Sequence, residues 1–329
     1  MKKLLSILLF FSFTFIYAQP EMSKIASMPG AFSRMGFGAR GIALGNAMSS
    51  VTSGNLSAYY NPALSVFQKG NHFQAAYSSL SFDRHLNFVG FTKKFSIGRD
   101  KKTGKARSTA GVSLGIINAG VSGISGRDNQ GFSTGELSTS ENQFLISISK
   151  MVGDKLAVGL SMKFYYYKLY EKISSTSLGF DLGALYRVND KMNVSFVVTD
   201  LNSSYKWDTS SLYSIYGKIS EDAFPWLAKL GTSYFIKSFK STFSLEYERS
   251  SAATNYLRAG VEYNPLERLF FRAGIDRLNI SNFDEPALFS FGFEYSHRLL
   301  GVEAGVNYAY VYEPYSTGDR HIVGIVLGL

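Results

Sequence analysis

Charged side chains that could pair with one another recur at polar positions in the later part of the sequence. They stand in segments where polar and apolar residues alternate, and both signs of charge are interleaved. Opposite charges on neighbouring strands can form ion pairs that fill an interior and fix strand register. The alternative is a polar pathway or a docking site for another segment of the chain. The ten candidates are Lys163, Asp181, Lys229, Glu246, Arg258, Glu262, Arg272, Asp276, Glu294 and Glu303.

Residue patterns for catalysis or for binding a cofactor are weak. The four histidines show no spacing typical of metal ligands, and the chain has no cysteine for a thiolate site or a disulfide. Residues 36–41 match the GxGxxG dinucleotide pattern, but Met-Pro-Gly stands where its strand should be and no acidic residue follows at the required distance. Only His321 and Ser316 suggest a hydrolase. We therefore expect no catalytic residue, no metal and no cofactor, in a protein that is not an enzyme.

The alternation predicts the elements that carry the charged residues. In residues 301–312 one face holds valine, alanine and tyrosine, while the other holds glycine, glutamate, asparagine and alanine. A period of two is typical of a strand with one apolar and one polar face. Because tyrosines border the apolar face, we expect lipid on that side and a polar interior on the other.

The same pattern predicts an all-β fold, a 14-stranded antiparallel transmembrane β-barrel with a short N-terminal helical hatch. An even strand number and short turns on one side, with long connections on the other, are typical of bacterial outer-membrane barrels. We expect the hatch and both termini to face the periplasm. The expected strands are 71–82, 85–95, 108–120, 139–152, 155–171, 176–188, 191–202, 224–236, 239–250, 254–264, 268–279, 285–297, 299–313 and 319–329.

The first 70 residues differ from the rest of the chain. Residues 1–18 have two lysines, an apolar core and a plausible cleavage site, which predicts a signal peptide. Residues 19–70 are rich in small residues and do not alternate, so we expect a hatch that packs inside or beneath the barrel of residues 71–329. An exported barrel of this kind would contact membrane lipid and lipopolysaccharide, and no nucleic-acid partner is expected despite the net charge of +9.

Aromatic residues gather in the long connection of residues 203–226, which holds both tryptophans of the chain. Aromatic side chains exposed on a loop would form a contact surface or a lid, and the candidates are Tyr205, Trp207, Tyr213 and Tyr216. An equally simple alternative is that these aromatic residues belong to the aromatic belt of a membrane barrel, because Phe224 and Trp226 stand at the start of an expected strand, where that belt lies.

A second long connection, predicted for residues 96–108 on the side of the short turns, is strongly basic. Its arginines and lysines could contact an acidic periplasmic partner or lipid phosphates. A solvated charge run is the preferred interpretation.

Two short segments of the hatch resemble a known family. The first runs Ser33-Arg34-Met35-Gly36-Phe37-Gly38-Ala39-Arg40-Gly41-Ile42-Ala43-Leu44-Gly45-Asn46-Ala47, and the second runs Ser57-Ala58-Tyr59-Tyr60-Asn61-Pro62-Ala63-Leu64. Together they resemble the opening of the PorV/PorQ family, with Gly38, Arg40, Gly45, Asn61 and Pro62 as the hatch motif. The resemblance implies a component of the type IX secretion system, with a secretion translocon or surface proteins as partners. The second segment also resembles FadL-type transporters of hydrophobic molecules.

Two functions therefore stay open. The preferred one is a non-enzymatic secretion component that binds protein partners or cargo at its extracellular rim. The alternative is a FadL-like channel for small hydrophobic molecules, which needs an apolar pocket where hatch and wall meet. The interior residues are mostly charged or small, which favours the first function.

Overall fold

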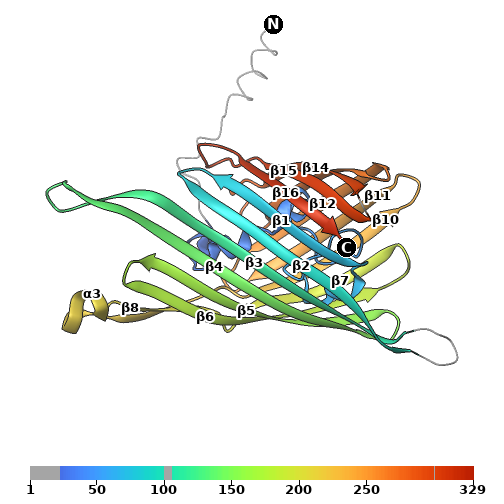
Figure 1. Cartoon of the computed structure of the whole chain (residues 1–329), viewed down its shortest axis with the longest axis horizontal. Helices are drawn as coiled ribbons and strands as arrows, with labels where there is room; N and C mark the ends of the chain where they lie inside the picture. Colours follow the sequence, from blue (N-terminus) through green and yellow to red (C-terminus); the bar gives the residue numbers. More distant parts are fainter. Residues whose placement is uncertain (1–22, 100–105, 300) are drawn as a thin grey trace, which may run out of the picture.

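The computed structural model of the chain describes residues 23–99, 106–299 and 301–329. Fourteen strands form a closed antiparallel barrel in which β1 pairs with both β2 and β16 (Figure 1). The predicted fold class is confirmed. The wall strands are β1 Asn71–Leu80, β2 Arg84–Arg99, β3 Ala106–Arg127, β4 Ser133–Val152, β5 Leu156–Tyr170, β6 Ile173–Arg187, β7 Met192–Leu201, β10 Leu227–Ile236, β11 Ser241–Ser250, β12 Asn255–Leu266, β13 Leu269–Asn279, β14 Leu288–Leu299, β15 Val302–Val311 and β16 Arg320–Gly328.

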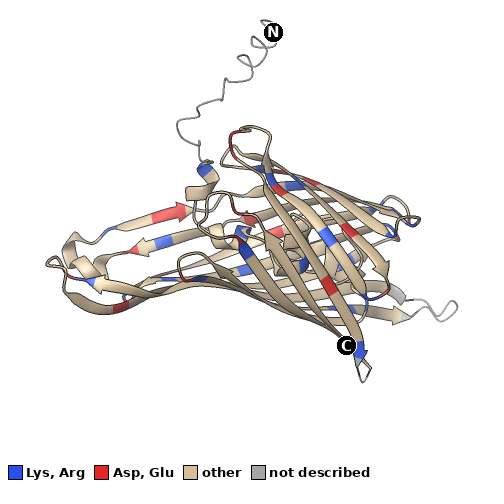
Figure 2. Cartoon of the chain, turned by 90° about the horizontal axis from the view of Figure 1, so that it is seen from above, with Lys and Arg blue, Asp and Glu red and all other residues tan. Residues whose placement is uncertain are grey.

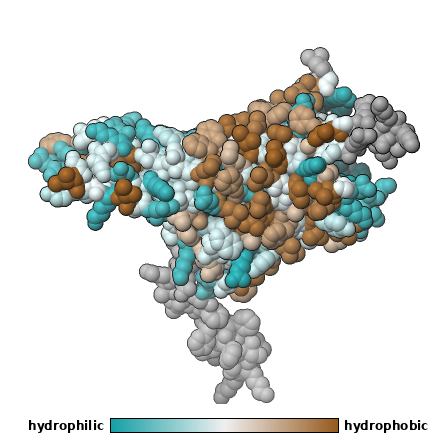
Figure 3. Space-filling model, turned by 90° about the horizontal axis from the view of Figure 1, so that it is seen from below, coloured by the Kyte–Doolittle hydropathy of each residue, from teal (hydrophilic) through white to brown (hydrophobic). Residues whose placement is uncertain are grey.

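The side chains alternate between the two surfaces of the wall as a two-residue period requires. In β4, Phe144, Ile146 and Ile148 are exposed on the outside, while Leu145 and Ser147 are buried on the inside. Figure 3 shows that such apolar side chains form a broad band over the middle of the barrel, between more polar regions. A barrel with this band is solvated by lipid on the outside and filled by protein on the inside.

The two ends of the barrel differ, and we name them by their connections. Short turns join β4 to β5, β6 to β7 and β10 to β11 at the short-turn end, where Leu329 also pairs with Asn71. The hairpin of β3 and β4 and the connection from β7 to β10 project at the opposite, long-loop end (Figure 1).

Three connections are more ordered than the sequence predicts. β3 and β4 pair as far as Arg127 and Ser133, and β2 and β3 pair as far as Arg99 and Ala106, where loops were expected. These extensions are rich in serine, threonine and glycine, so they have no apolar face to reveal them. They are strands because each continues the hydrogen bonds of a pair already formed in the wall. The lysines of the predicted basic turn at 101, 102 and 105 lie outside the described residues.

The connection of residues 203–223 also contains secondary structure. β8 Ser204–Asp208 pairs with β9 Ile219–Ala223 in a separate two-stranded sheet. The short helix α3 Ser210–Tyr213 and the 3-10 turn η4 Ser214–Tyr216 form the tip of this hairpin. The hairpin projects from the long-loop end beyond the wall (Figure 1).

The hatch lies inside the barrel and consists of short helices. They are the 3-10 helices η1 Lys24–Ser27, η2 Ala31–Arg34 and η3 Pro62–Phe67, and the α-helix α2 Gly38–Ala43. α2 packs on β1 and β13 to β16, and η3 packs on β2 to β6, so the two helices contact opposite parts of the wall. No helix among the described residues is long and apolar enough to cross a membrane.

The hatch extends toward both ends of the barrel. Its first described residues lie near the long-loop end, where Tyr256 at the start of β12 donates a hydrogen bond to Ser23. The chain leaves the hatch at the short-turn end, where β1 begins at Asn71. The N-terminus lies outside the described residues, so the prediction that the hatch and both termini face the periplasm stays a prediction. The predicted signal peptide lies outside the described residues, and the division into hatch and barrel domains at residue 70 stays a prediction.

Candidate functional site

Arg40 joins the hatch to the wall. It stands on α2, whose N-terminus begins at Gly38 with a positive φ of 69°. Its Nε and Nη2 donate to the two carboxylate oxygens of Glu262 on β12 at 2.9 and 2.8 Å. Its Nη1 donates to the carbonyl oxygens of Ser53 and Asn55. The guanidinium is 4% exposed, and a two-point contact of this kind fixes position as well as charge.

The Glu262 carboxylate is shared with a second arginine of the wall. Arg272 Nε on β13 donates to Glu262 at 2.7 Å, and its Nη2 donates to Glu294 on β14 at 2.8 Å. Three wall strands and the hatch are therefore held by one chain of ion pairs. Burial makes each member dependent on the others, since an unpaired buried charge is costly.

A second group of ion pairs surrounds Arg258 on β12. Its guanidinium donates to Asp276 at 2.6 Å and to both oxygens of Glu248 at 2.7 and 3.0 Å, and lies 3.4 Å from Glu246. Lys229 on β10 lies 3.5 Å from Glu248. The hatch joins this group through Asn46, which donates to Asp276 at 2.8 Å.

A third group lies on the other side of the hatch. Lys163 Nζ on β5 contacts Asp181 and Asp200 at 2.8 and 3.0 Å, and Tyr165 donates to Asp200 at 2.6 Å. Asp200 has a positive φ of 61° where the register of β6 and β7 shifts. Because a bulge breaks alternation, Asp200 reaches the interior beside Thr199, which is also buried.

The structure gathers nine of the ten predicted charged residues into these three groups, with Glu248, Asp200 and Arg40 added. The exception is Glu303, which is exposed near the start of β15 at the short-turn end and forms no ion pair with any described residue. It occupies an inward position, but it lies at the open short-turn end of the wall, where its exposed carboxylate accepts a hydrogen bond from Ser296 at 3.3 Å.

The sequence pattern does not predict some of the charged interior residues, and the reasons differ. Glu248 lies two residues after Glu246 on β11 and so faces the same side of the wall, which means that the alternating pattern could have predicted it. Asp200 and Arg277 break alternation at bulges, and Arg277 has a φ of 56° where the register of β12 and β13 shifts. The sequence gives no signal for either displacement.

The remaining hatch motif residues provide close contact with the wall. Asn61 accepts from the Ala63 amide to begin η3, donates to Ser49 O, and lies 3.3 Å from Ala184 O of β6. A Cβ on Gly45 would lie 2.4 Å from Ile275 O, and one on Gly159 of β5 would lie 2.4 Å from the carbonyl carbon of Pro62. Glycines of the wall likewise leave room for hatch backbone or side chains at Gly111, Gly183, Gly231, Gly260, Gly274 and Gly292.

The predicted aromatic contact residues do not share one surface. Tyr205 is 1% exposed, with ring centroids 4.8 Å from Phe224 and 5.4 Å from Tyr167 and Trp207. Burial raises the pKa of its hydroxyl above the usual value. The prediction that Tyr205 is a free contact residue is therefore wrong, because β8 turns it toward the barrel interior. Trp207 is partly buried beside it and donates to Asp222.

Tyr213 and Tyr216 remain exposed, at 61% and 81%, on the tip of the β8–β9 hairpin. They therefore lie apart from the buried aromatic group around Tyr205. A partner at this tip stays a prediction.

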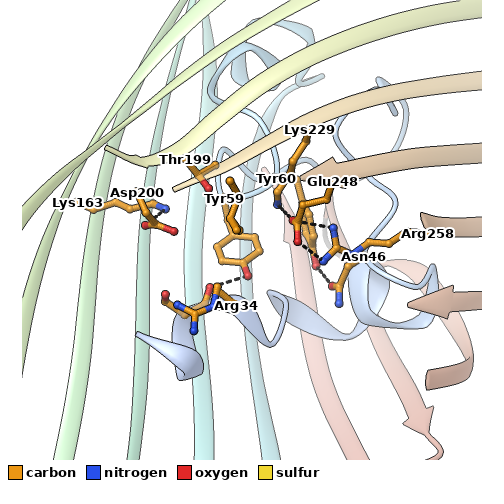
Figure 4. Close-up of a pocket in the computed structure, with 12 residues that line it drawn as sticks. Arg34, Asn46, Tyr59, Tyr60, Lys163, Thr199, Asp200, Lys229, Glu248 and Arg258 are labelled. Carbon is orange, nitrogen blue, oxygen red and sulfur yellow. Dashed lines mark hydrogen bonds and ion pairs between the residues drawn. The ribbon is translucent and has the colours of Figure 1, made fainter. Parts of the chain in front are cut away.

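Cavities lie where the hatch meets the wall at both ends of the barrel. Two of about 330 and 320 Å³ lie toward the short-turn end, beside Val66 and Phe67 and beside Thr52 and Ser53. Two others lie toward the long-loop end. The smaller has a volume of about 20 Å³, room for about one water molecule, and is lined by charged and tyrosine side chains including Tyr59, Tyr60 and Lys229 (Figure 4). The larger has about 190 Å³ and opens near the first described residues. The hatch contributes Ile25, Ala26, Ala31 and Met35 to it, along with Arg34, and the wall contributes Tyr256, Glu248, Arg258, Arg277 and Glu285.

No protein-family model and no curated protein matches the sequence. Solved structures do match, over 88–89% of this chain. They include the toluene transporter TbuX of Ralstonia pickettii, with 14% identity, 97% of that chain covered and a TM-score of 0.61. The toluene transporter TodX of Pseudomonas putida has 14% identity, with 96% of that chain covered and a TM-score of 0.55. A FadL homologue of Pseudomonas aeruginosa has 11% identity, with 96% of that chain covered and a TM-score of 0.55.

These neighbours correct the family expected from the hatch motif. They are hydrocarbon transporters and a FadL homologue, so the assignment to PorV/PorQ and to type IX secretion is wrong. The motif residues instead serve contacts between hatch and wall that a barrel with an internal hatch requires. At identities of 11–14% the likeness is one of fold, a 14-stranded barrel of the kind these transporters have.

Proposed function

We propose that the protein is a non-enzymatic channel of the bacterial outer membrane that admits small hydrophobic molecules. The short-turn end would face the periplasm and the long-loop end the exterior. The hydrocarbon transporters among its structural neighbours support a transport role over a secretion role.

The observation that carries this proposal is the 190 Å³ cavity between the hatch and the wall. An apolar cavity of about 150 Å³ is enough to bind benzene in another protein. Ile25, Ala31 and Met35 offer an apolar surface of the hatch to such a molecule. On the wall side, Glu248 and Arg258 already pair with each other, so an uncharged ligand need not compensate either charge. Arg34 and Glu285, which also line the cavity, are held by hydrogen bonds to uncharged groups.

Passage beyond this cavity requires the hatch to move. Ala39, Ala43 and Leu64 are at most 1% exposed, and the hatch backbone packs directly against the wall at Gly111, Gly159, Gly260 and Gly274. A molecule bound near the long-loop end therefore meets a packed hatch. We propose that the ion pairs hold the hatch in this resting position and that part of it shifts during transport.

Filling the cavity tests the proposal. Ala31 lines the cavity and is itself exposed, so Ala31→Trp adds bulk there without disturbing the packed core. We expect uptake of radiolabelled toluene, by cells that lack other hydrophobic channels, to fall to the level of cells without the protein. The matched control is Ala223→Trp on exposed β9, which should keep the uptake of the unmodified protein.

Both variants must first run as folded barrels on a heat-modifiability gel. Equal uptake by the two variants would contradict the assignment of the cavity. An unmodified protein that gives no uptake above cells without it would contradict the channel.

A further inference from the structure

Exposed charge differs between the two ends of the barrel. Four lysines, which we call the basic rim, are exposed around successive short turns from β4 to β10: Lys150, Lys155, Lys191 and Lys237. Asp154 and Asp190 are the exposed acidic residues of the same turns, and Lys240 adds a further cation in the turn after β10. Figure 2 shows Lys and Arg at the turns of this end.

The basic rim is not neutralised by the protein. None of the four side-chain ammonium groups forms an ion pair or hydrogen bond with any residue that the structure describes, although the backbone of Lys191 donates to Asn189. The long-loop end of the same strands differs, because Lys168, Lys172, Lys206 and Lys218 are matched there by Glu171, Asp208, Glu221 and Asp222. Lys206 lies 3.9 Å from Glu221.

The basic rim stands directly beyond the lipid-facing surface. Lys150 follows Ile148 on the outer face of β4, and Ile148 is 58% exposed. Lys155 precedes Leu156, which pairs with the outward Tyr186, and Lys191 precedes Met192, which pairs with the outward Tyr234. Phe239, 67% exposed, lies between Lys237 and Lys240.

Aromatic residues followed by lysines are typical of the boundary between hydrocarbon and headgroups. The rings lie at the boundary, and the ammonium groups extend to the phosphates beyond it.

We propose that the basic rim binds the phosphate headgroups of anionic phospholipids in the leaflet that surrounds the short-turn end. The membrane itself places a layer of phosphates next to the lysines, so binding needs no separate pocket. Each lysine close to an anionic surface adds attraction that salt screens. The interaction would set the depth of the barrel in the membrane and enrich anionic lipid at this sector, independently of what the channel transports.

Lipid retention measured by native mass spectrometry tests the proposal. Full-length mature protein in non-ionic detergent is incubated with equal amounts of phosphatidylglycerol and phosphatidylcholine that have the same acyl chains. We expect the unmodified protein to retain phosphatidylglycerol in preference by at least about tenfold. The variant with Lys150, Lys155, Lys191 and Lys237 each changed to Glu should lose the preference, and the corresponding Gln variant should reduce it.

The matched control changes Lys168, Lys172, Lys206 and Lys218 to Glu, which alters net charge equally at the other end. It should keep the preference. Equal loss in the control, or no preference in the unmodified protein, would overturn the proposal. Adding inorganic phosphate distinguishes a free anion from a headgroup, because displacement of the lipid at millimolar phosphate would assign the lysines to a soluble anion. If the Glu variant does not fold, the Gln variant decides the outcome.

Discussion

At the scale of single residues, Arg40 contributes most to the position of the hatch. Its guanidinium contacts one wall carboxylate and two hatch carbonyls, so it fixes the fold of the hatch and its docking together. No other residue of the hatch makes a two-point ion pair with the wall among the described residues. Glu262 depends on it in turn, although Arg272 supplies a second partner.

We expect Arg40→Ala to lower the free energy of unfolding by about 3–5 kcal/mol, because removing one partner leaves Glu262 partly unpaired in the interior. Guanidinium unfolding of the protein in lipid bilayers, followed by tryptophan fluorescence, measures the change. The control is Arg84→Ala on the exposed start of β2, which should change stability by less than about 0.5 kcal/mol. Similar stability of the two variants would show that Arg40 does not hold the hatch.

The sequence alone predicts the inward position of most of the charged interior residues, because every second residue of a regular strand faces the same side. Lys163, Asp181 and Arg272 occupy inward positions of regular strands, where a period of two decides the face. Asp200 and Arg277 could not be placed, because each follows a bulge that shifts the face by one residue. Their partners, such as the Lys163 contact of Asp200, depend on the barrel's curvature and on the neighbouring strands.

At the scale of elements, the β8–β9 hairpin combines a buried base with an exposed tip. Tyr205 at the base packs on Phe224 and Tyr167, which joins the hairpin to the aromatic group inside the long-loop end. Tyr213 at the tip is 61% exposed and has no such packing. The two tyrosines therefore provide a matched comparison within one element.

We expect Tyr205→Ala to increase the rate of protease cleavage within residues 203–223 by at least about tenfold, because loss of a buried aromatic ring costs several kcal/mol and opens the hairpin. Tyr213→Ala should leave the rate unchanged within about twofold. Limited proteolysis of the intact barrel, with fragments identified by mass spectrometry, measures both. Equal cleavage rates for both variants would mean that the base of the hairpin is not held by Tyr205.

Strands of the membrane wall could be predicted closely, whereas strands beyond it could not. β12 and β13 have apolar outer faces, so their alternation is visible, and their observed bounds lie within two residues of those expected. The extension of β3 to Arg127 has serine and glycine on both faces, so its pairing depends on β4 and not on its own pattern. The helices of the hatch are too short to show a helical period in the sequence, so the sequence could not predict their bounds.

At the scale of the whole molecule, the barrel and its internal hatch could be predicted, but the choice between two functions could not. The alternation of apolar and polar residues in the wall strands shows which face contacts lipid and which faces the interior, and this depends on the fold and not on the function. The residues of the hatch motif, such as Arg40 and Asn61, form contacts between hatch and wall. A barrel with either function needs such contacts, so the motif does not distinguish the two functions. Function depends on the cavity at the long-loop side, which forms from residues far apart in the sequence.

Movement of the hatch during transport is the central claim, and a reversible cross-link tests it most directly. The hydroxyl oxygens of Ser49 in the hatch and Ser195 on β7 lie 2.9 Å apart, so cysteines at both positions can form a disulfide. The chain has no cysteine of its own, so no other thiol competes. The control pair is Ser250→Cys with Thr254→Cys, whose oxygens lie 2.6 Å apart within the wall alone.

The measurement is toluene uptake by cells that carry Ser49→Cys with Ser195→Cys, before and after reduction, with the cross-link confirmed by mass spectrometry. We predict uptake at the level of cells without the protein when the disulfide is closed, and full uptake once it is reduced. The control pair should transport equally in both states. Equal uptake by the closed and reduced hatch pair would contradict the account.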